Sequence, residues 1–148
     1  MHKIIITGPE SSGKTTLCKA LSKHFNLPFS KEYAREYLEK LNSNYNQDDL
    51  LKIAKGQLQA ENGIQLLDTD LITLKIWSEY KYGSCDKWIL DEIKKQKSEK
   101  RFYLLCKADI PWEADPQREN PNDREKLFEI YKKETESLRH DYFVVEGE

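Results

Sequence analysis

The chain has 148 residues, of which 34% are charged and 38% are hydrophobic, and its net charge at pH 7 is −2. This length and balance predict one domain with a core and a charged surface. Acidic and basic residues mix along the whole chain, so we expect no nucleic-acid partner. Isolated cysteines and histidines lack zinc-ligand spacing, and no apolar segment is long enough for a signal peptide or a membrane span. We therefore expect a cytoplasmic protein with free thiols.

The first predicted elements are a short strand and a helix joined by a glycine-rich turn. Residues 4–7 form a β-branched run that is typical of a strand buried on both faces. Apolar side chains then recur at helical spacing over residues 14–25, and Asn26 and Pro28 end this helix. A second short strand is predicted around residues 27–30. Strand and helix thus alternate from the start of the chain.

The same alternation continues to the last residues. The predicted elements are a helix from Asp48 or Asp49 to Asn62, a strand at 64–68, helices at 71–80 and 86–98, a strand at 102–106, an irregular proline-containing segment at 109–121, a helix from Asn122 or Asp123 through Leu138, and a strand at 142–145. Residues 41–47 are polar and asparagine-rich, which predicts a loop.

Five short strands separated by helices predict an α/β protein, in which helices cover both faces of a five-stranded parallel sheet. Right-handed crossovers place the carboxyl ends of all the strands at one edge, where ligands bind in such folds. Four residues with useful chemistry follow predicted strands: Gly8, Glu32, Asp68 and Asp109. The whole chain, residues 1–148, is predicted to be one domain.

Residues 8–15 match the phosphate-binding pattern G-x-x-x-x-G-K-[ST]. The pattern follows a predicted strand and opens a predicted helix, as phosphate binding by backbone N–H groups requires. Together with the predicted parallel sheet, it predicts the P-loop NTPase fold. Lys14 supplies a positive charge for the terminal phosphates of ATP, and the Thr15 hydroxyl is placed to bind Mg²⁺. The candidate nucleotide-binding residues are Gly8, Glu10, Ser11, Ser12, Gly13, Lys14, Thr15 and Thr16.

Three acidic residues are candidates for metal binding and proton transfer. Asp68 ends an apolar strand, where a carboxylate that holds Mg²⁺ belongs, so Thr15 and Asp68 are the candidate metal ligands. Asp70 is a candidate catalytic carboxylate, and the alternative is that it caps the helix that begins at Leu71. Glu32 is a candidate general base or anchor for a substrate hydroxyl, and the alternative is a solvated helix start.

A segment at residues 110–124 is rich in proline and charge and precedes a long helix. Its Arg118 and Arg124 are candidate catalytic residues, because small-molecule kinases use such a lid to bring arginines onto the transferring phosphoryl group. The alternative is a surface loop with solvated arginines. Residues 106–109 are similar to the guanine motif of GTPases but lack its asparagine, so a GTPase is a weaker hypothesis than a kinase. A regulatory ATPase stays open.

Four motifs occur in order along the chain: G-P-E-S-S-G-K-T-T, E-Y-A-R-E-Y, L-L-D-T-D and D-I-P-W. Together they resemble the ribosylnicotinamide kinase domain of NadR proteins and the small NadR-like ATPases, over residues 1–148. The resemblance implies ATP-dependent phosphorylation of the 5′-hydroxyl of nicotinamide riboside, which gives nicotinamide mononucleotide. It also implies phosphate and Mg²⁺ binding by Lys14 and Thr15, metal, ribose or base roles for Asp68 and Asp70, and a substrate and lid region around Trp112.

The chain departs from this family in two places. Nothing matches the H-x-G-H phosphate site of the NadR adenylyltransferase domain, so NAD synthesis is not expected. The chain ends after its fifth predicted strand, whereas relatives continue into a loop that helps to hold adenine and a final helix, so either this sequence is truncated or its grip on adenine is reduced. Three hypotheses remain: a nicotinamide riboside kinase, an ATPase whose hydrolysis switches partner binding, and a kinase for another small hydroxylated acceptor.

Overall fold

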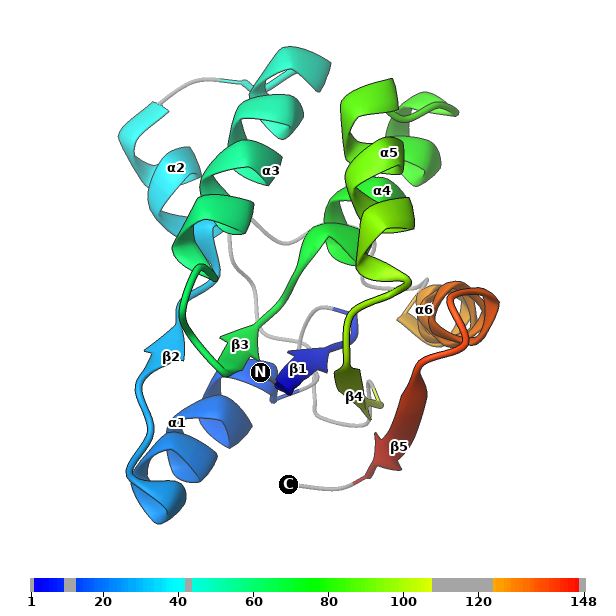
Figure 1. Ribbon diagram of the computed structural model, residues 1–148. Helices are drawn as coiled ribbons and strands as arrows, with labels where there is room; N and C mark the ends of the chain where they lie inside the picture. The colour runs from blue at the N-terminus through cyan, green and yellow to red at the C-terminus, as the bar shows by residue number, and fades with distance from the viewer. Residues whose placement is uncertain (1, 10–12, 42–43, 108–123, 147–148) are drawn as a thin grey trace.

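The computed structural model describes residues 2–9, 13–41, 44–107 and 124–146 (Figure 1). Their secondary structure alternates as the sequence predicts. The elements are β1 (Lys3–Thr7), α1 (Lys14–Phe25), β2 (Phe29–Ser30), α2 (Tyr33–Leu41), α3 (Gln47–Ala60), β3 (Leu66–Asp68), α4 (Leu71–Tyr82), α5 (Lys87–Gln96), β4 (Arg101–Cys106), α6 (Arg124–Ser137) and β5 (Asp141–Val145).

The strands form one parallel sheet in the order β2-β3-β1-β4-β5, which confirms the predicted fold class. β1 lies at the centre because its run of isoleucines is suited to burial on both sides. Ile6 of β1 is in register with Asp68 of β3, so Asp68 lies beside the strand end from which the phosphate loop leaves. Sheet order thus brings two distant segments of the sequence to one place.

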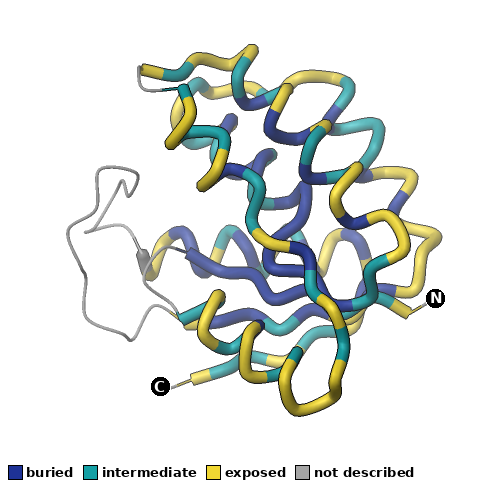
Figure 2. The backbone as a smooth tube through the Cα atoms, turned by 90° about the vertical axis from the view of Figure 1, so that its left-hand side faces the viewer, coloured by how far each residue is buried: buried dark blue, intermediate teal, exposed yellow. Residues whose placement is uncertain are grey.

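Helices cover both faces of this sheet. α1 lies on one face, where Cys18 packs with Ile6 and Leu66. On the other face, α3, α4 and α6 form the larger core, which includes the fully buried Leu67 and Tyr103 (Figure 1). The burial pattern follows this layering, with most of the inner strands β1, β3 and β4 and the sheet-facing sides of the helices buried (Figure 2). The edge strand β5 has no buried residue. Each fully buried aliphatic side chain contributes about 1.5–3 kcal/mol to the free energy of unfolding.

Several element boundaries differ from the predicted ones for local reasons. α3 begins at Gln47 because Asn46 and Asp49 form a reciprocal capping box, so the cap lies two or three residues before the predicted Asp48 or Asp49. α4 continues to Tyr82 because Gly83 adopts the left-handed conformation that ends a helix. The sequence placed no complete helix at Tyr33–Leu41, where the structure has α2. The predicted irregular segment at 109–121 lies outside the described residues.

No helix within the four described ranges is long and apolar enough to span a membrane.

Candidate phosphate-binding site

The phosphate loop leaves β1 through a glycine that no other residue can replace without strain. Gly8 has a φ of +144°, and a Cβ atom at this position would lie 2.5 Å from the backbone oxygen of Cys106 in β4. At the other end of the loop, Gly13 has a φ of 80° and is the N-cap of α1. Both ends of the loop therefore need glycine, which fits a backbone that wraps around an anion. Glu10, Ser11 and Ser12 lie outside the described residues.

Substitution of Gly8 by alanine is expected to lower the free energy of unfolding by about 1–3 kcal/mol, because the new methyl group overpacks against fixed backbone. Gly63→Ala is a matched control, since Gly63 also has a positive φ (+76°) but nothing lies within 4 Å of its added Cβ. Thermal or urea unfolding of the two variants separates the effect of φ from that of the clash. An equal loss in both variants would contradict a clash with Cys106.

The structure brings four of the predicted site residues together. The Thr15 hydroxyl, in the first turn of α1, donates a hydrogen bond of 2.9 Å to Oδ2 of Asp68 at the end of β3. Lys14 Nζ lies 4.0 Å from Oε2 of Glu32, which follows β2. Helix α1 and the ends of β2 and β3 thus place two carboxylates, an ammonium group and a hydroxyl at one edge of the sheet.

Charges at this site shift the pKa values of its groups. Burial lowers the pKa of Lys14, but the carboxylates of Glu32 and Asp68 raise it by more, so the pKa lies above its usual value and the ammonium stays charged. Burial raises the pKa of Asp68, while Lys14 and the Thr15 hydrogen bond oppose the rise. A cation that binds beside Asp68 would therefore stabilise the ionised form of this buried carboxyl group.

The groups present fit a magnesium ion. Oδ1 of Asp68 is buried, and no described residue forms a hydrogen bond with it, so this oxygen points at a place where a ligand is expected. Within the described ranges, no cluster of three or more His, Cys, Asp or Glu residues forms a metal site of its own. Magnesium that binds together with phosphates needs only one or two protein oxygen ligands and keeps several waters. Thr15 and Asp68 match that requirement.

The remaining predicted site residues are only partly described. Thr16 is exposed on α1, next to Thr15. Arg124 is the first residue of α6, and its side chain lies outside the description. Arg118 and Trp112 lie wholly outside the described residues, so the proposed lid stays a prediction.

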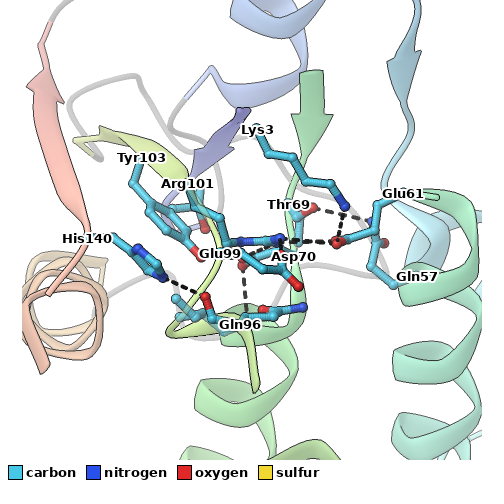
Figure 3. A network of polar contacts seen from close by, with 12 residues as sticks. Lys3, Gln57, Glu61, Thr69, Asp70, Gln96, Glu99, Arg101, Tyr103 and His140 are labelled. Atoms are coloured by element: carbon cyan, nitrogen blue, oxygen red, sulfur yellow. Dashed lines mark hydrogen bonds and ion pairs between the residues drawn. The ribbon is translucent and has the colours of Figure 1, made fainter. Parts of the chain in front are cut away.

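Asp70 lies in a buried network and not beside Lys14, which differs from its predicted catalytic position (Figure 3). Its side chain is fully buried and caps α4 by accepting a hydrogen bond from the backbone N–H of Ile72. Its other oxygen accepts hydrogen bonds from Arg101 and from the Tyr103 hydroxyl. A carboxylate enclosed in this way has no free oxygen for a substrate hydroxyl, so the alternative role as a cap describes Asp70 better than the role of a base.

Arg101 at the start of β4 is the centre of this network. Its guanidinium bonds Asp70 at 3.1 Å and Glu61 at 3.2 Å, and its side chain is fully buried. Burial lowers the pKa of Arg101, yet the neighbouring carboxylates raise it above its usual value. This network could not be predicted from local sequence patterns, because Asp70 and Glu61 lie 31 and 40 residues from Arg101.

Gln57 is a polar residue at the site that sequence reasoning missed. It is fully buried on α3, and its side chain bonds to the backbone of both Tyr33 and Thr69. A signal was present: Leu50, Ile53 and Ala54 predict the buried stripe of α3, and Gln57 continues that stripe at helical spacing. An amide on an apolar stripe indicates a specific buried partner.

A family model described as an AAA domain matches residues 3–148. The chain belongs to this family. The NadR protein of Escherichia coli (strain K12), a trifunctional NAD biosynthesis/regulator protein, is 30% identical over 130 residues, which cover 78% of this chain. A crystal structure of NadR protein in complex with NR has a TM-score of 0.69 at 24% identity, with 97% of this chain and 44% of that chain covered. The structure of deoxyadenosine kinase from M. mycoides with bound dCTP has a TM-score of 0.58 at 14% identity. The match covers 97% of this chain and 89% of the kinase chain.

These similarities confirm that the AAA domain is a NadR-like P-loop protein, as the four sequence motifs predict. The chain spans 30% of the length of the curated NadR proteins that it matches. At these low identities, the two solved structures establish a shared kinase-like fold.

Proposed function

We propose that this domain transfers the γ-phosphoryl group of ATP to a hydroxyl group of a small nucleoside-like molecule, with nicotinamide riboside as the acceptor. The observation that carries the proposal is the meeting of Lys14, Thr15, Glu32 and Asp68 at one edge of the sheet. The relatives named for NAD biosynthesis, and the NadR structure solved with NR, support nicotinamide riboside as the acceptor.

Each of the four residues has a distinct task in this reaction. Lys14, which stays charged, binds the oxygens of the terminal phosphates and stabilises the charge that develops on them. Thr15 and Asp68 would hold Mg²⁺, which when bound neutralises phosphate charge. Glu32 is half-exposed and lies beside Lys14, so its carboxylate can reach a hydroxyl that approaches the γ-phosphate.

The chemical step follows from this arrangement. The acceptor oxygen forms a bond to the γ-phosphorus, and the bond from that phosphorus to the β,γ-bridging oxygen breaks. Glu32 accepts the proton that the hydroxyl loses, and ADP leaves with the electron pair of the broken bond. Lys14 pairs with Glu32 in the structure described here, so phosphate binding to Lys14 would free the Glu32 carboxylate for this proton.

The decisive experiment is incubation of the protein with Mg²⁺, ATP and a panel of nucleosides, followed by separation of the products by mass. We expect ADP and nicotinamide mononucleotide in equal amounts when nicotinamide riboside is the acceptor. Formation of a monophosphate from another nucleoside would support the kinase activity and contradict nicotinamide riboside as the acceptor. ADP that forms at the same rate without any acceptor, and with no monophosphate, would contradict the kinase and favour the regulatory ATPase.

The affinity for Mg²⁺ together with nucleotide is expected to fall as the pH is lowered. The fall should begin at a higher pH than it would for a metal site with an exposed aspartate. Protons and Mg²⁺ compete for the ionised Asp68, and burial raises the pKa of this carboxyl, so the affinity rises with pH until Asp68 is ionised and then levels off. Calorimetric titration with AMP-PNP between about pH 5 and about pH 8 measures this effect. The Mg²⁺-dependent gain is the increase in AMP-PNP affinity when Mg²⁺ is added. Asp68→Asn is expected to remove this gain at every pH, and a gain that persists would exclude Asp68 as a ligand.

A further inference from the structure

Gln57 has a fully buried side chain on α3, among the aliphatic residues Leu50, Ile53 and Ala54 that face the core. Its Oε1 accepts a hydrogen bond of 2.9 Å from the backbone N–H of Tyr33. Its Nε2 donates one of 3.3 Å to the backbone oxygen of Thr69. Tyr33 offers a donor and Thr69 an acceptor, so only one orientation of the amide satisfies both partners. The side chain is therefore held in one position.

The two partners of Gln57 directly follow the two acidic residues of the site. Tyr33 is the first residue of α2 and comes immediately after Glu32. Thr69 comes immediately after Asp68, at the end of β3 (Figure 3). One amide thus links the turn that carries the proposed base to the turn that carries the proposed metal ligand. In sequence these partners lie 24 and 12 residues from Gln57.

The turn at Thr69 needs this support. Thr69 has a φ of +81°, a conformation that β-branched residues rarely adopt. Its backbone N–H donates to the oxygen of Ile6 in β1, and its oxygen accepts from Gln57. Strained residues persist only where their surroundings fix them from several sides, and Gln57 supplies one of those sides. Loss of this contact would let the turn relax and Asp68 rotate away from Thr15.

We propose that Gln57 is a positioning residue, which sets the distance and direction between Glu32 and Asp68 without touching substrate or metal. This inference rests on the proposed function, because it assigns to Gln57 the geometry of that same site. Partners that orient a metal ligand are typically worth about 10–100-fold in metal affinity or activity.

Gln57→Met keeps the length and approximate volume of the side chain and removes both hydrogen bonds. We expect the Mg²⁺-dependent gain in AMP-PNP affinity to fall by about 10–100-fold, while binding without Mg²⁺ stays at the wild-type level. The turnover number with Mg²⁺, ATP and acceptor should also fall. Amide hydrogen exchange at Tyr33 should accelerate, because its N–H loses its acceptor.

Gln57→Glu separates the two contacts and serves if the methionine variant does not fold. An ionised carboxylate still accepts from the Tyr33 N–H but no longer donates to the Thr69 oxygen, whereas a protonated carboxyl could do both. This variant is therefore compared with the wild type at about pH 9, where a buried carboxyl ionises. Protection of the Tyr33 amide should remain, whereas the Mg²⁺-dependent gain should be lost. Ile53→Ala is the control for stability alone, since Ile53 is buried one turn earlier on the same helix and belongs to the hydrophobic core.

Ile53→Ala should lose thermal stability and keep the Mg²⁺-dependent gain. The inference is overturned if both Gln57 variants keep the wild-type gain, or if Ile53→Ala loses it to the same extent. A wild-type protein that binds Mg²⁺ with AMP-PNP but transfers phosphate to no acceptor would overturn the proposed function, and the comparison of Gln57 variants would still decide the present inference.

Discussion

Lys14→Ala is expected to abolish phosphoryl transfer, with a loss of at least about 10²–10³-fold in turnover. The reason is that Lys14 is the described cation that opens α1 at the phosphate loop, and removal of one well-placed donor to developing charge costs this much in other enzymes. The measurement is the initial rate of ADP and monophosphate formation at saturating ATP. Near-normal turnover in a folded variant would exclude the phosphate loop as the catalytic site.

Two controls make this result specific. Lys23→Ala removes an exposed lysine from the last turn of the same helix and should leave turnover unchanged. The unfolding midpoint of Lys14→Ala should also be measured, because the substitution leaves Glu32 without its ion-pair partner and Asp68 without a nearby positive charge. A fall in turnover without a fall in midpoint assigns the loss to chemistry.

Arg101→Met is expected to lower the free energy of unfolding by about 3–5 kcal/mol. Methionine occupies similar space, but the buried carboxylates of Asp70 and Glu61 lose their shared counter-charge, and an unpaired buried charge carries a penalty of this size. Since a domain is stable by only about 5–15 kcal/mol, the loss is a large fraction of the total. Urea unfolding followed by circular dichroism measures it.

The control for this prediction is the exposed ion pair between Lys95 and Glu92 on α5. Lys95→Ala should change stability by less than about 1 kcal/mol, because solvent screens a pair at the surface. Adding Asp70→Asn to Arg101→Met should recover part of the lost stability, since the Asp70 carboxylate then no longer carries an unpaired charge, whereas Glu61 keeps its ion pair with Lys3 at 3.0 Å. A cost for Arg101→Met no larger than that of the surface pair would show that the network contributes little.

The phosphate loop and the strand end at Asp68 were predictable because their signals are local. A glycine-rich turn between an apolar strand and an amphipathic helix has few other structures available, and Asp68 directly ends an apolar run. The meeting of Thr15 with Asp68 followed from the parallel sheet, since the carboxyl ends of neighbouring strands share an edge.

The sequence pattern included the cap role of Asp70 as an alternative but could not decide between cap and base, because the buried partner Arg101 lies 31 residues away. Sequence alone leaves an aspartate before a helix free to be a cap, a base or both. Arg101 follows the polar residues 97–100, so the sequence pattern predicts an exposed side chain. In the structure β4 pairs with β1, and Arg101 is buried. The buried stripe of α3 could have predicted the burial of Gln57, but not its role, since its two backbone partners belong to other elements.

The order of the strands also has a consequence for how the chain folds. The central strand β1 pairs only with β3 and β4, so that Ile6 meets Asp68 and Lys3 meets Arg101, and both pairings close long stretches of chain. Closing a long loop costs chain entropy before the contacts that stabilise it have formed, and this slows folding. Competence to bind nucleotide should therefore appear late in refolding, after β4 has docked, because Gly8 rests against Cys106 of that strand. A nucleotide that binds only the finished site would then stabilise the completed fold without helping the chain to reach it.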